Sequence, residues 1–592
     1  MRRPLALLFA LVLAAIPVVA TASTLADPPT PDPNFLGTVT PVPCTPEPGN
    51  PYEEAQIAAE GWDDNVRYPG ACQRLRFRFG PIPIKPGQND VLVQPVTIEK
   101  PGYDGYITRF DPDLVRVDGT VPPIDEIHLH HATWLSVPTY GSGPFFAAGE
   151  EKTIATFPKG YGMPIKRTDA WALLYMIHSA IPEPDVVFIT YDVDYIAKDV
   201  AEADPINIKP AYSVWLDVES GGYPVFNTQR QYADEAGTCT YPAENCADFD
   251  AFGNVRPSQG LPSDRPGADL RLPAKGEGLG AVPNFQGGTL IGIGGHLHPG
   301  GLRNEVDVVR AGEPEPRRIY TSDAVYWDRQ DSSQPGGPPT SWDFSMTVTG
   351  LPRWGVHLEP GDILRSNATY DTTNQSTYEN MGIVVALIAP DDPKGNPTAP
   401  GVNPFDAPFD PAAGCPSGGL SAPTPTLCDK GVVTHPHLAE NDNFGGPEGD
   451  ELDAPQGDST NRVDIAAFLY NPGDLSTISM GIPTVPLGST LKFFNEDALI
   501  DVYHSATSCA YPCTGRTGTA FPLGNGRSSA GRDLDFDSGE LGFGLPAVGA
   551  AKQSFDWDLE VTTANGFQPG EIITYYCRIH PFMRGAFEVA PA

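Results

Sequence analysis

The apolar positions of the chain fall into short runs separated by turn-forming residues. Residues 124–135, 172–180 and 290–298 are three such runs, each strand-like and rich in Leu, Ile or aromatic side chains. The 62 glycines and 65 prolines amount to about a fifth of the chain, against about 12% in ordinary proteins. So many turn formers leave little room for long helices, and the pattern predicts an all-β protein of short strands.

The first 22 residues have the pattern of a secretory signal peptide. Met1-Arg2-Arg3 is a short positive start, residues 5–19 are apolar, and residues 20–22 supply a small-x-small cleavage pattern. We therefore expect a secreted, extracytoplasmic protein in which disulfides are allowed. No later stretch of the sequence is long and apolar enough to predict a membrane span.

Charge and turn content limit the partners and divide the chain. A formal charge of −36 would repel nucleic acid and anionic lipid, so neither is expected as a partner. A hydrophobic content of 40% still suffices for packed cores. The 592 residues predict three or four domains at about 150 residues each. Residues 23–70 are expected to form an irregular lead-in, and residues 391–427 a Pro/Gly-rich linker.

The nine cysteines are informative in an exported chain. Eight of them fall into four neighbouring couples that could close short loops, namely Cys44 with Cys72, Cys239 with Cys246, Cys415 with Cys428, and Cys509 with Cys513. Cys577 is left over. An odd cysteine in an oxidising compartment implies intermolecular pairing, a reactive thiol or metal ligation.

The neighbours of Cys577 favour metal ligation. Cys577, His580 and Met583 form the pattern C-x2-H-x2-M, and a thiolate, an imidazole and a weak thioether suit a trigonal blue-copper site. His504, on an upstream strand, is the candidate for the fourth ligand. Residues 428–592 resemble a cupredoxin, with a ligand loop similar to that of amicyanin. The resemblance implies a Greek-key β-sandwich with one type 1 copper for electron transfer. The alternative is a buried free cysteine beside an incidental histidine.

Six of the eleven histidines lie in the apolar runs of the front half. They are His128, His130, His131, His178, His296 and His298. Residues i and i+2 of a strand share a face, so His296 and His298 can reach one metal, and so can His128 and His130. His131 then points away unless a bulge intervenes. Neutral imidazoles suit copper, zinc and iron alike.

The order of these histidines, followed by Met381, resembles the copper type II ascorbate-dependent monooxygenases, such as peptidylglycine α-hydroxylating monooxygenase and dopamine β-monooxygenase. The resemblance covers about residues 70–390. It implies two jelly-roll-type β-sandwich domains side by side, over residues 71–230 and 231–390.

The resemblance also implies the metal ligands. An electron-transferring copper would lie on His130, His131 and His178. The catalytic, O2-binding copper would lie on His296, His298 and Met381. Strand alternation alone favours His128 over His131 beside His130, so that choice stays open. The alternative for the whole front half is a sandwich whose histidines satisfy core hydrogen bonds or bind a structural metal.

Several positions depart from this family. Ala368 and Gly382 stand where the family has cysteines beside the methionine segment, which is consistent with the loss of one disulfide. Gly294 stands where peptide-amidating members have an arginine for the peptide carboxylate. The residues after Met381 also lack the Asn and Tyr that help those members hold substrate. A glycine-extended peptide is therefore not the expected substrate.

These features together predict an exported multicopper monooxygenase with about three copper ions per chain. It would hydroxylate a C–H bond of a small organic substrate with O2, using electrons from an external donor that is ascorbate-like or a redox protein. The alternative is a secreted copper-binding electron-transfer protein without oxygenase activity. A third hypothesis, an acidic cell-surface binding module, explains the charge and none of the ligands. His435 and His437 form a surface pair or an extra ligand pair, and His357 is expected to be structural.

Overall fold

The structure is a computed structural model that describes Cys44 and most of residues 68–592. The segments outside the description after residue 68 are 92–94, 123–125, 141–143, 150–152, 180, 219–225, 229–237, 242–267, 299, 314, 327–341, 350–353, 372–376, 407–414, 416–426, 434–451, 501, 510, 512, 514–525, 528–532, 535, 537, 539–540, 543–554, 578 and 581. The expected signal peptide, Cys246, His435 and His437 therefore lie outside the described residues. The all-β prediction is confirmed, since the described part contains one short α-helix, α3 (Lys198–Ala201).

The first β-sandwich follows the lead-in. One sheet has the order β1 (Gln73–Ile84), β10 (Asp185–Ala197), β4 (Gly105–Arg116), β8 (Tyr161–Ile165) and β11 (Lys209–Pro210), with β7 (Ala155–Thr156) beside β4. The other has the order β2 (Asn89–Val91), β9 (Ala170–Ser179), β5 (Ile127–Val137) and β6 (Pro144–Gly149), with β3 (Val96–Ile98) beside β9. Aromatic side chains fill the space between them, with Phe110 5.1 Å from Trp134 and 5.9 Å from Tyr191 between ring centroids.

The second part is built from one long antiparallel sheet. Its order is β12 (Tyr212–Asp217), β23 (Gly382–Pro390), β16 (Gly288–Leu297), β19 (Trp342–Val348), β18 (Arg317–Tyr326), β17 (Gly301–Val309), β21 (Ile363–Asp371) and β14 (Thr238–Tyr241). Three short strands join it, β15 (Ala268–Arg271), β20 (Val356–Leu358) and β24 (Val432–Val433), and β13 (Phe226–Thr228) pairs with β22 (Thr377–Asn380). Leu290 of β16 and Val384 of β23 share one core with Val306 of β17 and Tyr320 of β18, so the sheet folds over on itself and forms the second sandwich.

The third part is a sandwich of two mixed sheets. One has the order β25 (Gln456–Ser459), β28 (Ile482–Pro486), β35 (Arg584–Ala590), β34 (Ile572–Tyr576) and β30 (Thr507–Ser508). The other has the order β27 (Leu469–Asn471), β26 (Arg462–Ala466), β29 (Ser489–Asn495) and β33 (Asp556–Val561). The connections include β31 (Gly526–Arg527), β32 (Asp533–Leu534) and the 3-10 turns η2 (Leu475–Met480), η3 (Asp497–Ile500) and η4 (Thr563–Asn565).

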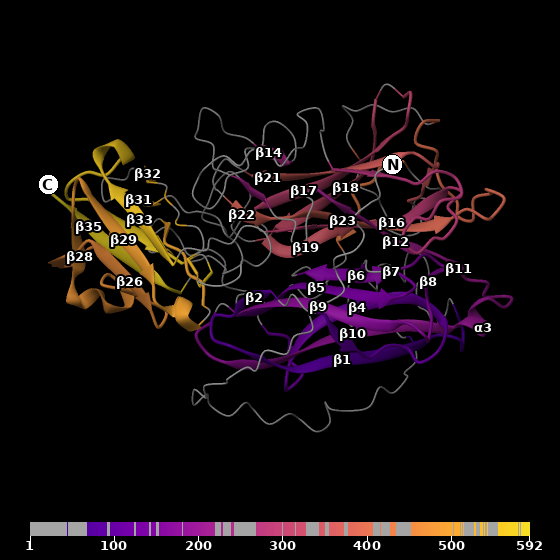
Figure 1. Ribbon diagram of the computed structural model, residues 1–592, viewed down its shortest axis with the longest axis horizontal. Coiled ribbons are helices and arrows are strands. Elements are labelled where there is room, and N and C mark those ends of the chain that lie inside the picture. Colours follow the sequence, from indigo (N-terminus) through magenta and orange to yellow (C-terminus); the bar gives the residue numbers. More distant parts are fainter. Residues whose placement is uncertain are drawn as a thin grey trace, which may run out of the picture.

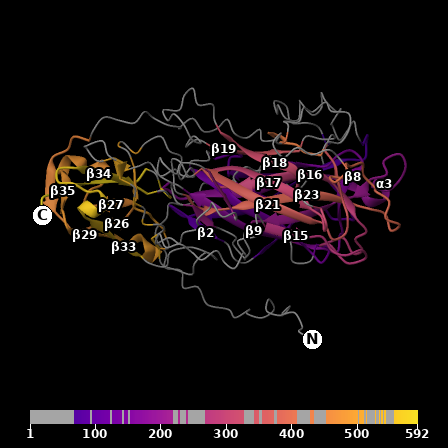
Figure 2. The ribbon, with the colours of Figure 1, turned by 90° about the horizontal axis from the view of Figure 1, so that it is seen from above.

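The first two sandwiches pack against each other, and the third lies beside them. The β5–β9 sheet of the first sandwich faces the β12–β23–β16 sheet of the second (Figure 1), and Ile291 and Ala389 of the second part join the first part's core cluster. The third sandwich lies at one end of this pair in both views (Figures 1 and 2). No helix among the described residues is long and apolar enough to cross a membrane.

Two strands near the expected domain limits pair with the second part. Strand β12 pairs with β23 and buries Val214 and Leu216 in the second core, although it precedes residue 230. Strand β24, which follows residue 427, pairs with β19 of the second part.

The local cysteine couples are disulfides where the structure describes both partners. Cys44–Cys72, Cys415–Cys428 and Cys509–Cys513 are bonded, and three predicted pairings are thereby confirmed. Cys239 is also disulfide-bonded. Cys577 is buried and free. Disulfides of this number are typical of proteins from oxidising compartments.

Candidate metal centres

The C-terminal centre is formed by the loop between β34 and β35. Cys577 follows the last residue of β34, and the loop returns to β35 at the pair Tyr576 and Arg584. The loop is closed by two backbone hydrogen bonds, from Met583 N to His580 O at 2.8 Å and from Cys577 N to Met583 O at 3.1 Å. This tight turn is what brings the two outer residues of C-x2-H-x2-M back toward each other.

Three donor atoms converge at this loop. Cys577 Sγ lies 3.8 Å from His504 Nδ1 and 3.7 Å from His580 Nδ1, and the two Nδ1 atoms are 3.1 Å apart. An ion with metal–nitrogen bonds of about 2.0–2.1 Å and a metal–sulfur bond of about 2.3 Å would place trigonal donors about 3.5–3.8 Å apart. All three side chains are buried. The donor set therefore fits a thiolate-containing copper site, with both sulfur–nitrogen distances in this range and the nitrogen–nitrogen distance shorter.

A carboxylate orients His504. Asp497, in η3, lies 3.0 Å from His504 Nε2 and also accepts the backbone N–H groups of Ala467 and Phe468. Burial raises the pKa of Asp497, but these hydrogen bonds outweigh it and lower the pKa overall. Burial also lowers the pKa of His504. The result is a neutral imidazole whose Nε2 carries the proton and whose Nδ1 is available to a metal.

The thiolate form of Cys577 requires a bound cation, because the side chain is buried. Burial raises its pKa to about 11, against which the backbone of Ser505 donates a hydrogen bond to Sγ at 3.3 Å. A thiol with this pKa is protonated and inert at neutral pH, whereas a bound metal ion deprotonates it. Met583, the weak thioether donor expected from the sequence, is buried in the same apolar cluster as Cys577.

The front histidines share one face of β5 because the strand contains a bulge. Leu129 pairs with Ile177 and His131 with Met176, so His130 is an extra residue in the β5–β9 ladder. Before the bulge the odd-numbered residues Ile127 and Leu129 face the core, and after it the even-numbered residues Ala132 and Trp134 do. His128, His130 and His131 are therefore all directed away from the first core, toward the second sandwich.

Strand β9 supplies His178 to the same face. His178 pairs directly with His128, and their ring centroids are 4.8 Å apart. Its Nε2 is buried and has no hydrogen-bond partner among the described residues. Burial lowers the pKa of His178 to about 3. A neutral imidazole with a buried open nitrogen fits a metal ligand.

The second sandwich contributes His296 and His298 from the end of β16. His296 pairs with Ile383 and Leu297 with Gly382, which brings the next residues of the two strands, His298 and Met381, side by side. The hydroxyl of Tyr370 accepts the backbone N–H of His298 at 2.9 Å and donates to Met381 O at 2.8 Å. The three residues that the resemblance assigns to the catalytic copper are therefore adjacent.

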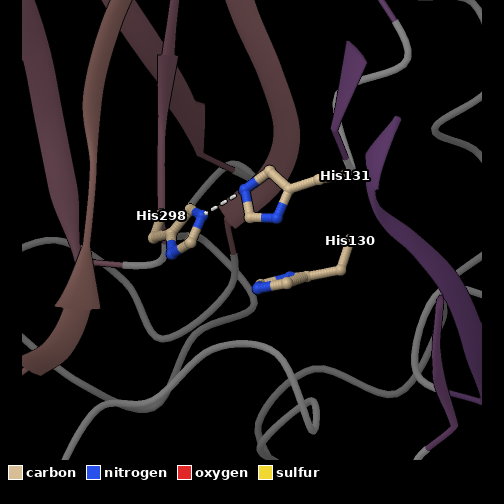
Figure 3. A group of neighbouring side chains, drawn as sticks. All are labelled: His130, His131 and His298. Atoms are coloured by element: carbon tan, nitrogen blue, oxygen red, sulfur yellow. Dashed lines mark hydrogen bonds between the residues drawn. The ribbon is translucent and has the colours of Figure 1, made fainter. Parts of the chain in front are cut away.

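The histidines of the two sandwiches meet. His131 Nε2 lies 3.0 Å from His298 Nε2, and the His130 ring centroid is 4.4 Å from His131 and 4.8 Å from His298. Figure 3 shows the His131 and His298 rings facing each other, with His130 beside them. The structure thus brings all six front histidines into one cluster, in which the two expected ligand sets touch.

The departures from the monooxygenase pattern have structural consequences. A Cβ on Gly382 would lie 2.5 Å from Ala368 Cβ, so the two positions that lack the family's cysteines are neighbours in the fold. A Cβ on Gly294 would lie 2.9 Å from Val348 Cγ1 of β19. This position therefore has no room for a side chain that could hold a substrate carboxylate.

The C-terminal centre packs directly against the segments that carry the histidine cluster. His580 Nε2 lies 3.2 Å from Gly87 O, in the turn between β1 and β2. The next residue, Gln88, accepts the backbone N–H of Ser179 at 2.8 Å, directly after His178. The His178 side chain hydrogen-bonds the backbone of Ile579, inside the C-x2-H-x2-M loop, and the rings of His178 and His580 are 6.4 Å apart.

Sequence reasoning missed this contact, and it left open whether β5 contains a bulge. The bulge has a signal in the sequence, because the apolar alternation Ile127, Leu129 resumes one residue late at Ala132, Trp134. Gly87 has no such signal. Two further groups among the described residues are explained without a metal. His357 Nε2 lies 3.2 Å from Asp391, and the Cys44, Cys72 and Asp194 group consists of a disulfide beside a carboxylate.

Comparison with known proteins gives distant likenesses. No protein-family model and no curated protein matches the chain. Among solved structures it is similar to a reduced amicyanin variant, at 21% identity over 22% of this chain and 79% of that chain, with a TM-score of 0.12. It is similar to the copper-containing nitrite reductase of Thermus scotoductus SA-01, at 15% identity over 55% of this chain and 58% of that one, with a TM-score of 0.13. The major capsid protein of bacteriophage PM2 matches at 9% identity over 54% of this chain and 99% of that one, with a TM-score of 0.21. Such low TM-scores carry no functional argument, so the function rests on the side chains themselves.

Proposed function

We propose that the chain is an exported copper-dependent monooxygenase with a fused electron-entry domain. The Cys577 centre would accept electrons one at a time from an external donor, an ascorbate-like molecule or a redox protein, and the histidine cluster would use them with O2 on a small organic substrate. The overall reaction is R–H + O2 + 2 electrons + 2 protons giving R–OH + H2O. The observation that carries the proposal is the direct contact between the two sites, in which His580 contacts Gly87 and Ile579 contacts His178.

The residues present fit this division of work. Copper would supply one-electron transfer at the Cys577 centre and oxygen chemistry at the cluster. His504, Cys577, His580 and Met583 would hold the first ion, and the six front histidines with Met381 would hold the others, about three ions in all. Asp497 fixes the His504 tautomer, and Tyr370 fixes the backbones of His298 and Met381.

The structure also shapes the substrate proposal. Gly294 is packed against Val348, so the peptide carboxylate site of amidating enzymes has no counterpart at that position. His131 is the one partly exposed member of the cluster, and the other five front histidines are buried. We propose that O2 and an uncharged part of the substrate reach the cluster on the His131 side.

Copper content and turnover test the proposal. Fully oxidised protein is expected to hold about three copper ions, one with the narrow hyperfine pattern of a thiolate site and two with ordinary nitrogen-ligand EPR signals. Cys577→Ser is expected to abolish donor-driven O2 consumption while the front ions remain bound. Unchanged donor-driven turnover in that variant would refute the electron-entry role.

An electron-transfer protein without oxygenase activity is the second candidate. It is favoured by the close burial of the cluster, which leaves little exposed ligand surface. The two functions separate in one measurement, reductant-dependent O2 uptake. Uptake coupled to a hydroxylated product supports the monooxygenase, whereas uptake that yields only peroxide, or none at all, supports the carrier.

A further inference from the structure

The contact between His131 and His298 joins two different sandwiches. His131 comes from β5 of the first and His298 follows β16 of the second, and their Nε2 atoms are 3.0 Å apart. One nitrogen from each of His130, His131 and His298 lies within 4.8 Å of the other two. Two neutral imidazole nitrogens at 3.0 Å can share a proton or share a metal ion.

Both sides of this contact are held in place by the fold. The bulge at His130 directs His131 toward the second sandwich. On the other side, the backbone of His298 donates to Tyr370 and its carbonyl accepts the N–H of Gly301 at 3.0 Å. The two rings therefore meet because their strands are fixed, not because exposed side chains have drifted together.

We propose that His130, His131 and His298 bind one transition-metal ion, copper in the native protein, that bridges the two sandwiches. This deepens the proposed function, since the ion belongs to the same histidine cluster. It changes the ligand grouping, because His298 completes the set of His130 and His131 in place of His178. His178 is then grouped with His128, its partner in the β5–β9 ladder, whose ring centroid is 4.8 Å away.

The geometry needs little adjustment to hold an ion. Metal–nitrogen bonds of about 2.0–2.1 Å place tetrahedral donors about 3.3–3.4 Å apart. The His131–His298 pair is already close to that value at 3.0 Å, and the donor nitrogen of His130 lies within 4.8 Å of both. Three imidazoles leave a coordination position open, as catalytic sites require, and His131 is the partly exposed member.

Copper counting in single and double variants tests the grouping. Full-length protein is loaded with Cu(I) against a chelator of known affinity, and bound copper is counted per chain in His130→Ala, His298→Ala and the double variant. If one ion is shared, each single variant loses one copper and the double variant loses the same single copper. If the residues serve separate ions, the double variant loses two, and the proposal is overturned.

Controls separate this inference from the proposed function. His357→Ala is the matched control, because its ring pairs with Asp391 outside the cluster, and it should keep the full count. The absorbance of the Cys577 centre after oxidation reports in every variant that the fold is intact. A wild-type count of one, with that absorbance present, would overturn both the cluster and the bridging ion, whereas a loss of two in the double variant overturns the bridging ion alone.

A second readout follows from the bridge itself. An ion bound only by the folded pair of sandwiches raises their unfolding temperature in proportion to its binding free energy. The copper-dependent rise should shrink equally in His130→Ala and His298→Ala, and no further in the double variant. An additive decrease would contradict a shared ion.

Discussion

At the residue scale, the centre with the best-defined chemistry depends on a few hydrogen bonds. Asp497 accepts from His504 and from two backbone N–H groups, so the carboxylate is held before any metal arrives. A carboxylate that accepts a hydrogen bond from a ligating histidine fixes the tautomer of the imidazole and raises its basicity. The thiol, the two imidazoles and the carboxylate therefore act as one unit.

Replacing Asp497 by Asn should weaken copper binding at the Cys577 centre. The amide lacks the negative charge that supports the protonated Nε2 of His504, and loss of such a partner costs about 10–100-fold in metal affinity. The measurement is a chelator titration followed by the thiolate–copper absorbance. Asp558→Asn is the control, because Asp558 pairs with Lys492 on the surface; equal affinities in the two variants would contradict the role of Asp497.

At the scale of elements, one bulge and one turn determine how the metal centres are placed. The bulge in β5 turns three histidines to one face. The turn between β1 and β2 places Gly87 O against His580. Gly87 has a φ of +59°, and a Cβ there would lie 2.4 Å from Phe468 Cε1 and 2.7 Å from His580 Nε2. Only glycine satisfies both the backbone conformation and the close approach.

Gly87→Ala should weaken the packing of the third sandwich against the first without removing the metal ligands of the Cys577 centre. Overpacking of this kind costs about 1–3 kcal/mol, and we expect slower passage of electrons from the Cys577 centre to the cluster. Rapid-mixing absorbance would show normal reduction of the Cys577 centre by the donor and delayed reoxidation by the front half. The control is Gly488→Ala, which has a φ of +88° but nothing within 4 Å of its Cβ position. Equal rates in the two variants would exclude the Gly87 turn as the contact that matters.

At the scale of the whole molecule, buried neutral imidazoles link folding to pH. Burial lowers the pKa values of His178, His504 and His580 in the folded state. In the unfolded chain these histidines take up protons below the ordinary histidine pKa of about 6.5, whereas in the folded chain they stay neutral to lower pH. Stability of the metal-free protein is therefore complete above about pH 7 and falls as the pH decreases toward the folded pKa values.

For His178, with a folded pKa of about 3, the loss between pH 7.5 and pH 5 is about 2 kcal/mol. Urea unfolding of chelator-treated protein at the two pH values measures it. His178→Asn removes the titrating group and should reduce the pH dependence by that amount. An unchanged slope in this variant would show that His178 is protonated in the folded state.

The sequence alone was sufficient for the local features of this protein. The all-β class follows from turn content, three disulfides follow from neighbouring cysteines, and the C-x2-H-x2-M pattern places three candidate donors within one short stretch of chain. The grouping of the front histidines is different in kind. His131 and His298 are 167 residues apart, and His580 and Gly87 are 493 apart. Such contacts depend on a one-residue bulge and on how the completed β-sandwiches pack against one another. Both are properties of the tertiary structure.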